Sequence, residues 1–137
     1  MEFREIDDLG AKPSKLIFEE ETYAIVGAAM EVYYKLGSGF QEAIYQEALG
    51  IEFSLRGVPY EPQKELRIDY KGNQLDKTYF VDFLCFGQIL VELKSITQLT
   101  SREWSQVINY LKVSNLHVGL LFNFGNTARL EQKRLIV

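Results

Sequence analysis

Three polar residues attract attention because they interrupt otherwise apolar segments. Asp82 lies within residues 79–85, and Glu92 and Lys94 lie within residues 89–95. Side chains alternate along a β-strand, so Glu92 and Lys94 are expected to share one face. A buried charge without a partner is costly, so charges on such strands need an explanation. Two carboxylates brought together would suit a divalent cation such as Mg²⁺ or Mn²⁺, which prefers oxygen ligands.

Whether the two carboxylates meet depends on the turn between their strands. Opposed residues on antiparallel strands point to the same side of the sheet. A turn centred on Gly87 places Asp82 directly opposite Glu92. A two-residue turn at Gly87 and Gln88 would shift the register by one residue and send Glu92 to the other face. The metal hypothesis therefore requires a turn of odd length or a bulge.

The chemistry that this arrangement indicates is hydrolysis of a phosphodiester bond. A divalent cation polarises a phosphoryl oxygen and helps to deprotonate an attacking water. Lys94 could orient that water or offset the negative charge that grows on the phosphate. The alternative is a structural charge cluster across two strands at a sheet edge, since Glu-x-Lys is a common pattern. Spacing and alternation leave both interpretations open.

Helical spacing of apolar residues dominates the first part of the chain. It predicts one helix from a cap at Ser14 to about Lys35 and a second helix that ends at Gly57. Ser38 and Gln41 stand three residues apart, as in a capping box that would open the second helix. The apolar stripe expected on this second helix consists of Ile44, Ala48, Ile51 and Leu55.

The later part of the chain has the two-residue period of strands. Strands are expected over residues 60–70, 78–85, 89–95, 117–124 and 130–137. A helix between the third and fourth of them is predicted by a capping box of Thr100 and Glu103 and by an apolar face. This order predicts an α/β fold with a mixed central sheet, in which three antiparallel strands are followed by a crossover helix and further strands.

Length and composition limit the classes of protein to be considered. The 137 residues suit one domain, which we place at 14–137, after a flexible arm at 1–13. The net charge of −4 counts against tight, non-specific binding of duplex nucleic acid. The single cysteine, Cys85, excludes an internal disulfide and a cysteine-rich metal site, and we expect it in the core. No signal peptide or membrane-length apolar run is visible, so a cytoplasmic protein without a membrane partner is expected.

Beyond these patterns, the chain resembles a known family. The segment GFQEAIY at residues 39–45 matches the pattern that names the GxxExxY protein family, which belongs to the PD-(D/E)xK nuclease-like superfamily. The resemblance continues through Asp82, through VELK at 91–94, through Gln106 and NYL at 109–111, and through GLLFNFG at 119–125. It extends from about residue 17 to residue 137.

The resemblance implies a restriction-endonuclease-like core and a set of site residues. It implies that Asp82 and Glu92 are the metal ligands and that Lys94 is the catalytic lysine. Glu42 resembles the acid of the superfamily's first helix, which supports the metal directly or through water, and Gln106 resembles a residue of the downstream helix near the site. The implied activity is that of a nuclease that uses Mg²⁺ (or Mn²⁺) to cut DNA or RNA.

Alternatives remain for individual residues and for the whole chain. Without the resemblance, Glu42 is a solvated acid that favours the start of its helix, and Tyr45 is a packing residue with a hydrogen-bonding hydroxyl. The alternative function is a non-catalytic module that keeps the nuclease fold and binds nucleic acid or protein. A homodimer is a further possibility, with aromatic side chains such as Tyr34, Phe40 or Tyr60 at the interface.

Overall fold

The structure is a computed structural model, and it describes residues 4–5 and 17–137. The predicted cap at Ser14 and most of the predicted arm at 1–13 lie outside these residues. The helices are α1 (Glu19–Leu36), α2 (Glu42–Arg56) and α3 (Ser101–Ser114). The strands are β1 (Arg4–Glu5), β2 (Tyr60–Tyr70), β3 (Asn73–Cys85), β4 (Ile89–Lys94), β5 (Val118–Asn123) and β6 (Glu131–Ile136).

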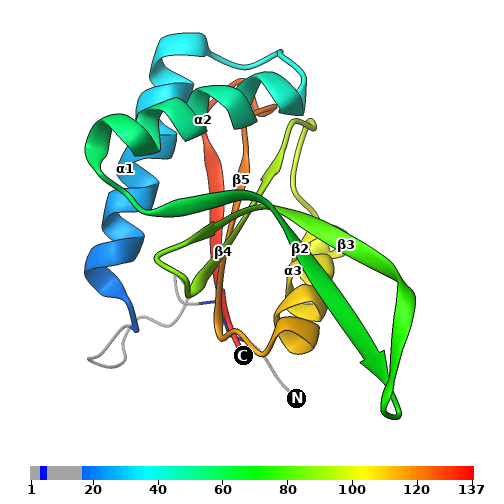
Figure 1. Cartoon of the computed structure of the whole chain (residues 1–137). Coiled ribbons are helices and arrows are strands. Elements are labelled where there is room, and N and C mark those ends of the chain that lie inside the picture. The colour runs from blue at the N-terminus through cyan, green and yellow to red at the C-terminus, as the bar shows by residue number, and fades with distance from the viewer. Residues whose placement is uncertain (1–3, 6–16) are drawn as a thin grey trace.

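The described strands form one six-stranded sheet in the order β1-β6-β5-β4-β3-β2. Strands β4 and β5 are parallel and are joined through α3, whereas the other neighbouring pairs are antiparallel. Helices α1 and α2 lie on one side of the sheet and α3 lies on the other (Figure 1). The predicted mixed sheet flanked by helices is therefore confirmed.

Strand β4 is apolar on both faces because helices cover both sides of the sheet. Ile89, Val91 and Leu93 pack into the core beneath α1 and α2, and Leu90 packs into the core beneath α3. Glu92 alternates with the first set and so belongs to the α3 side. The predicted distribution of side chains along this strand is confirmed.

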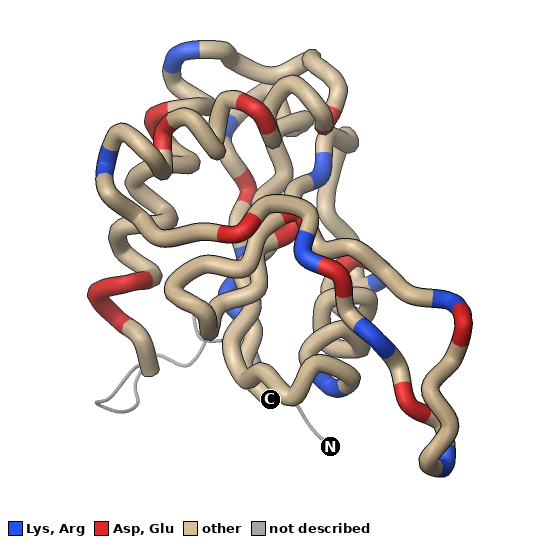
Figure 2. The backbone as a smooth tube through the Cα atoms, in the orientation of Figure 1, with Lys and Arg blue, Asp and Glu red and all other residues tan. Residues whose placement is uncertain are grey.

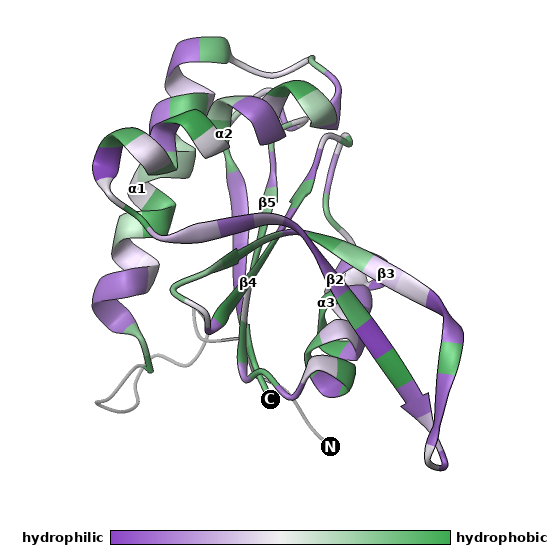
Figure 3. Ribbon diagram, in the orientation of Figure 1, coloured by the Kyte–Doolittle hydropathy of each residue, from purple (hydrophilic) through white to green (hydrophobic). Residues whose placement is uncertain are grey.

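The β2–β3 hairpin differs from the central strands in composition. It extends well beyond the rest of the sheet (Figure 1), and Lys or Arg and Asp or Glu follow one another along it (Figure 2). Its far half is also more hydrophilic than the central strands (Figure 3). Because the two signs of charge are interspersed, this hairpin does not form a basic surface for phosphates.

The turn between β3 and β4 has three residues, 86–88, and is centred on Gly87. The paired residues are Phe83 with Val91, Leu84 with Leu90 and Cys85 with Ile89. Phe86 and Gly87 both take left-handed backbone angles, with φ of 56° and 67°, and the Gln88 N–H donates to the Cys85 carbonyl at 3.0 Å. The odd-length turn that the metal hypothesis requires is confirmed.

Helix α2 departs from the prediction at its start and on its buried face. It begins after Gln41, which makes no side-chain capping bond, so the predicted capping box of Ser38 and Gln41 is wrong. Three of the four residues of the predicted stripe are also wrong, because Ile44, Ile51 and Leu55 are 45%, 56% and 76% exposed, whereas Ala48 packs against the core as predicted. The buried residues are instead Tyr45, Leu49 and Phe53.

Aromatic packing explains which face of α2 is buried. Tyr45 stacks on Phe124 with ring centroids 4.5 Å apart, and Phe53 meets Phe83 edge-on at 5.1 Å. Aromatic side chains bury more apolar area than Ile or Leu, so their face takes the core position. The Tyr45 hydroxyl donates to the Gly37 carbonyl and accepts from the Phe40 N–H, which confirms Tyr45 as a packing residue with a hydrogen-bonding hydroxyl.

Two further observations bear on the predictions. Cys85 is fully buried, which confirms it as a core residue, and burial raises the pKa of its thiol to about 12. Among the described residues, no helix is both long enough and apolar enough to cross a membrane.

Candidate active site

Asp82 lies where β3 and β4 stop pairing. The paired residues end at Phe83 and Val91, and the same register continued by one residue would place Asp82 opposite Glu92. At this position the Asp82 side chain accepts a hydrogen bond at its Oδ2 from the Leu93 N–H, at 2.7 Å. A side-chain carboxylate thus takes the place of a main-chain acceptor, and this bond fixes the orientation of Asp82.

Glu92 is a buried carboxyl group that is 7% exposed. Burial raises its pKa to about 10, together with a hydrogen bond to Asp82 and the negative charge of Asp82. The nearby Lys94 lowers this pKa and Glu42 raises it, but neither outweighs burial. In the protein without a bound cation, Glu92 therefore carries a proton at neutral pH and is hydrogen-bonded to Asp82.

Lys94 follows Glu92 by one pleat of β4 and reaches toward α3. Its Nζ donates to the Gln106 Oε1 at 3.0 Å. The pKa of Glu103 is lowered in spite of its slight burial, because the Thr100 N–H and hydroxyl donate to its carboxylate, and the positive charge of Lys94 adds a smaller contribution in the same direction. Gln106 thus holds the Lys94 ammonium group on the side of the sheet where Glu92 lies.

Glu42 is the first residue of α2 and is exposed. The Ser95 hydroxyl donates to the Phe40 carbonyl at 2.6 Å, which ties the chain just before α2 to the end of β4. The charge of Glu42 acts on Glu92. However, within residues 4–5 and 17–137 no three Asp, Glu, His or Cys side chains gather closely enough to hold a metal. The structure therefore brings Asp82, Glu92 and Lys94 together and leaves Glu42 at the periphery.

Two residues outside the predicted set also reach the site. The Gln46 amide donates to the Asp82 carbonyl at 3.3 Å and accepts from Gln63 at 2.8 Å. The sequence could have indicated Gln46, because it lies four residues after Glu42 on α2 and residues at this spacing share a helix face. The Tyr79 hydroxyl donates to the Glu92 Oε2 at 3.1 Å. No spacing rule indicated Tyr79, because this contact depends on the path of β3.

Arg102 lies in the first turn of α3. Its backbone N–H donates to the Thr100 hydroxyl at 3.2 Å, as part of the capping box that the sequence predicted. The Arg102 residue is exposed.

The donor set fits a hard divalent cation. Asp82, which is half-buried, is in contact with the buried Glu92, and each has one oxygen held by a hydrogen bond, from Leu93 and Tyr79 respectively. Mg²⁺ typically takes one or two carboxylates and completes its coordination with water and substrate phosphate oxygens. A cation would relieve the repulsion between the two carboxylates, which the proton on Glu92 relieves in the free protein.

Comparison with known proteins places the chain in a family. No curated protein matches the sequence. A solved structure, the crystal structure of SSO0001, aligns with 92% of this chain and 69% of its own at 16% identity and a TM-score of 0.48, which is too distant to carry an argument. The family model of the PD-(D/E)XK nuclease superfamily matches residues 19–135, a span that runs from α1 into β6 and includes the candidate site. The chain therefore belongs to the PD-(D/E)XK nuclease superfamily.

Proposed function

We propose that this protein is a divalent-metal-dependent nuclease that hydrolyses phosphodiester bonds in DNA or RNA. Membership of a nuclease superfamily supports a nuclease-type function. The observation that carries the specific proposal is the contact between the buried Glu92 and the half-buried Asp82, with Lys94 beside it. The GxxExxY pattern at residues 39–45 supports a narrower assignment within the superfamily.

In this proposal, each site residue has a defined task. Asp82 and Glu92 hold Mg²⁺ or Mn²⁺, and Glu42 adds negative charge at the edge of the site. When bound, the metal supplies Lewis-acid stabilisation of the phosphate and a more acidic water. Lys94 orients the attacking water and offsets the charge that develops on the phosphate oxygens. Gln106 positions Lys94 through the bond to its ammonium group.

A cleavage screen tests the proposal. The purified protein would be incubated with single-stranded, duplex and structured DNA and RNA, each with Mg²⁺, with Mn²⁺ or with EDTA. We expect cleavage of at least one substrate that requires the metal and is lost in Asp82→Asn. Stabilisation by the metal without cleavage of any substrate would instead support the non-catalytic binding module.

Metal affinity is expected to depend on pH because binding must displace the proton from Glu92. The pKa of Glu92 is about 10 in the free protein, so between pH 6 and pH 9 each bound cation releases about one proton. The apparent affinity for Mg²⁺ or Mn²⁺ should therefore rise by up to about tenfold per pH unit in this range. Calorimetric titration in buffers of different ionisation enthalpy would measure both the affinity and the released proton. An affinity independent of pH would contradict this coupling.

Tyr79 is expected to orient Glu92 for metal binding. Its hydroxyl holds one oxygen of Glu92 at 3.1 Å, and loss of such a supporting bond typically lowers metal affinity about 10–100-fold. Tyr79→Phe should show this loss in a metal titration followed by thermal unfolding. The matched control is Tyr110→Phe, because the Tyr110 ring packs against Tyr79 without being the donor to Glu92. Equal metal affinity in both variants would remove Tyr79 from the proposed site.

A further inference from the structure

Asn123 is a fully buried polar side chain at the end of β5. It alternates with Leu121, which packs into the core beneath α3, so Asn123 lies on the α3 side of the sheet. In the pairing of β5 with its two neighbours, Asn123 is the partner of Lys94 on β4 and of Glu131 on β6. Lys94, Asn123 and Glu131 therefore form a row of polar side chains across three strands, beside the candidate active site.

The Asn123 side chain binds the segment that joins β4 to α3, residues 95–100, which we call the β4–α3 connection. Its Oδ1 accepts from the Ile96 N–H at 2.9 Å and from the Gly125 N–H at 3.0 Å. Its Nδ2 donates to the Ile96 carbonyl at 2.9 Å and to the Glu131 Oε1 at 2.7 Å. A side-chain amide offers two donor hydrogens and two acceptor lone pairs, and all four are used here. Asn123 thus holds both main-chain polar groups of Ile96, as a neighbouring strand would.

Glu131 holds the other end of the β4–α3 connection. Its Oε1, which accepts from Asn123, also accepts from the Leu99 N–H at 3.1 Å. Leu99 lies two residues before the start of α3. Asn123 and Glu131 together therefore fix the connection both next to the strand end that carries Lys94 and next to the helix that carries Gln106.

Two glycines let the backbone of β5 and of the residues after it come close to these elements. A Cβ built on Gly125 would overlap the main-chain nitrogen and oxygen of Ile96, so the connection lies directly against Gly125. A Cβ built on Gly119 would stand 2.8 Å from a methyl group of Val107, so α3 lies directly against Gly119. The segment 119–125 thus contains contacts to the connection at one end and to α3 at the other.

We propose that Asn123, supported by Glu131, is a positioning residue that fixes the β4–α3 connection and so keeps Lys94 and Gln106 within hydrogen-bonding distance. The Lys94 Nζ and the Gln106 Oε1 are 3.0 Å apart, and the connection is the direct link between their elements. A displacement of a catalytic group by about 1 Å can lower a rate by about 100-fold. The catalytic consequence rests on the proposed nuclease function, whereas the positioning of Lys94 does not.

The side-chain amide of Gln106 reports the positioning without any catalytic activity. In nitrogen–proton correlation NMR spectra of the metal-free protein, its Nε2 signals are assigned with Gln106→Ala, and Lys94→Ala gives their position when the bond is absent. We expect Asn123→Ala to shift these signals toward their position in Lys94→Ala, although Lys94 itself is unchanged. Signals at the wild-type position in a folded Asn123→Ala variant would overturn the proposal.

A matched pair of variants at Glu131 provides the same test if Asn123→Ala does not fold. Glu131→Ala removes the acceptor of the bonds from Leu99 and Asn123, whereas Glu131→Gln keeps an oxygen acceptor and removes the charge. Glu131→Ala should shift the Gln106 signals in the same direction, and Glu131→Gln should restore them toward the wild-type position. Equal shifts in the two variants would assign the effect to charge and overturn the positioning role.

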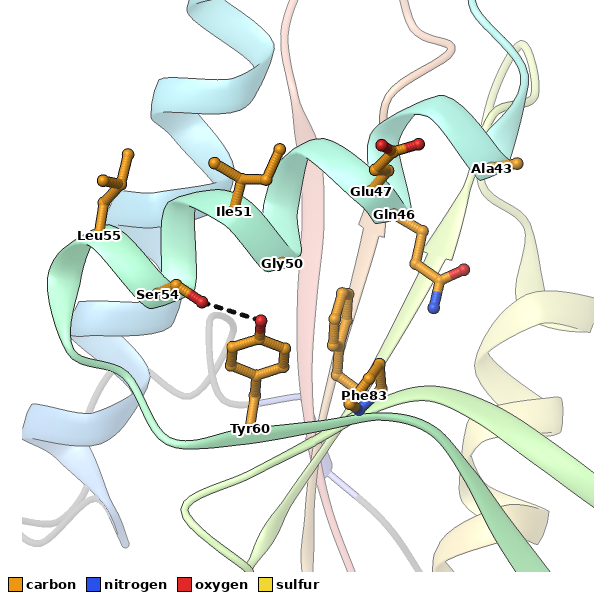
Figure 4. Close-up of a pocket in the computed structure, with 10 residues that line it drawn as sticks. Ala43, Gln46, Glu47, Gly50, Ile51, Ser54, Leu55, Tyr60 and Phe83 are labelled. Atoms are coloured by element: carbon orange, nitrogen blue, oxygen red, sulfur yellow. Dashed lines mark hydrogen bonds between the residues drawn. The ribbon is translucent and has the colours of Figure 1, made fainter.

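Tyr60→Ala is the control for a general loss of stability. Tyr60 lies on the other side of the sheet, where its ring packs against Phe83 and its hydroxyl is 2.9 Å from the Ser54 hydroxyl (Figure 4). This variant should lower the melting temperature and leave the Gln106 signals in place. A shift as large as that in Asn123→Ala would show that the signals follow stability alone, against the proposal.

Single-turnover cleavage tests the catalytic consequence. With saturating Mg²⁺, Asn123→Ala should lower the rate by up to about 100-fold. In a Gln106→Ala background the same substitution should have a smaller effect, because changes that disturb one contact are not additive. An equal reduction in both backgrounds would overturn the action of Asn123 through this contact.

The two readouts separate the positioning role from the nuclease function. If the Gln106 signals shift in Asn123→Ala but the wild-type protein cleaves no nucleic acid, the positioning of Lys94 stands and the nuclease proposal fails. If the wild-type protein cleaves and neither the signals nor the rate respond to Asn123→Ala, the nuclease proposal stands and the positioning role fails.

Discussion

Replacing Lys94 by alanine is expected to lower the rate of phosphodiester cleavage by at least about 100-fold while metal binding persists. Lys94 does not share a hydrogen bond with Asp82 or Glu92, and its bonded partner is Gln106. Its positive charge opposes a cation at the neighbouring carboxylates, so removing it should leave the metal affinity unchanged or higher. The variant therefore separates the loss of chemistry from the loss of the metal.

Two measurements on the same preparations check this expectation. Single-turnover cleavage gives the rate of the chemical step, and a Mg²⁺ or Mn²⁺ titration followed by thermal unfolding gives the affinity. Gln106→Ala is the matched control, because it frees the Lys94 ammonium without removing its charge. We expect Gln106→Ala to lose less activity than Lys94→Ala. If Lys94→Ala cleaved at the wild-type rate, Lys94 would have no catalytic role.

Replacing Glu92 by glutamine is expected to stabilise the metal-free protein above neutral pH, by about 1–3 kcal/mol. The pKa of Glu92 is about 10 in the folded protein and 4.5 in its ordinary environment. Between these values the folded state keeps a proton that the unfolded chain has lost. The free energy of unfolding of the wild type therefore decreases as pH rises from about 4.5 toward 10. Glutamine removes this dependence because it does not ionise.

Denaturant unfolding in EDTA at several pH values from 6 to 9 measures the effect. The difference between Glu92→Gln and the wild type should grow with pH, and an added metal should stabilise the wild type only. At a hundredfold excess over its dissociation constant, the metal should contribute about 2.7 kcal/mol to the wild type. Equal stability of the two proteins across this range would show that folding does not raise the pKa of Glu92.

Glu103→Gln is the control with the opposite sign. The pKa of Glu103 is lowered in spite of slight burial, because the Thr100 N–H and hydroxyl donate to its carboxylate. A lowered pKa contributes stability above the ordinary value of 4.5, and this contribution is lost as pH falls. At neutral pH, Glu103→Gln should therefore be less stable than the wild type. A uniform effect of all Glu→Gln changes would point to net charge and not to the local environments.

The two carboxylates that are proposed to hold the metal also destabilise the protein when no metal is bound. Asp82 and Glu92 are held against each other by the Leu93 N–H and the Tyr79 hydroxyl, in a position where one of them must retain a proton. Such a pair lowers the stability of the metal-free protein above neutral pH and offers two carboxylates to a cation. Carboxyl groups with strongly shifted pKa values are commonly found at functional sites.

Local sequence patterns alone determined which site side chains share a face of the sheet and where α3 begins. The alternation of Glu92 and Lys94 along an apolar strand, and the equal spacing of Asp82 and Glu92 from Gly87, predicted which side chains share a face. The Thr100 and Glu103 capping box located the start of α3. These features could be read from the sequence because each depends on residues close together in the chain.

Only the tertiary structure decided the remaining features, because they depend on contacts between distant segments. The sequence of α2 offers two apolar faces, and the choice between them is made by the rings of Phe124 and Phe83, which belong to other elements. The bond from Tyr79 to Glu92 depends on the course of β3 beyond its pairing with β4. Local periodicity carries no information about which surface a helix or strand will meet, and packing against that surface selects the buried residues and completes the site.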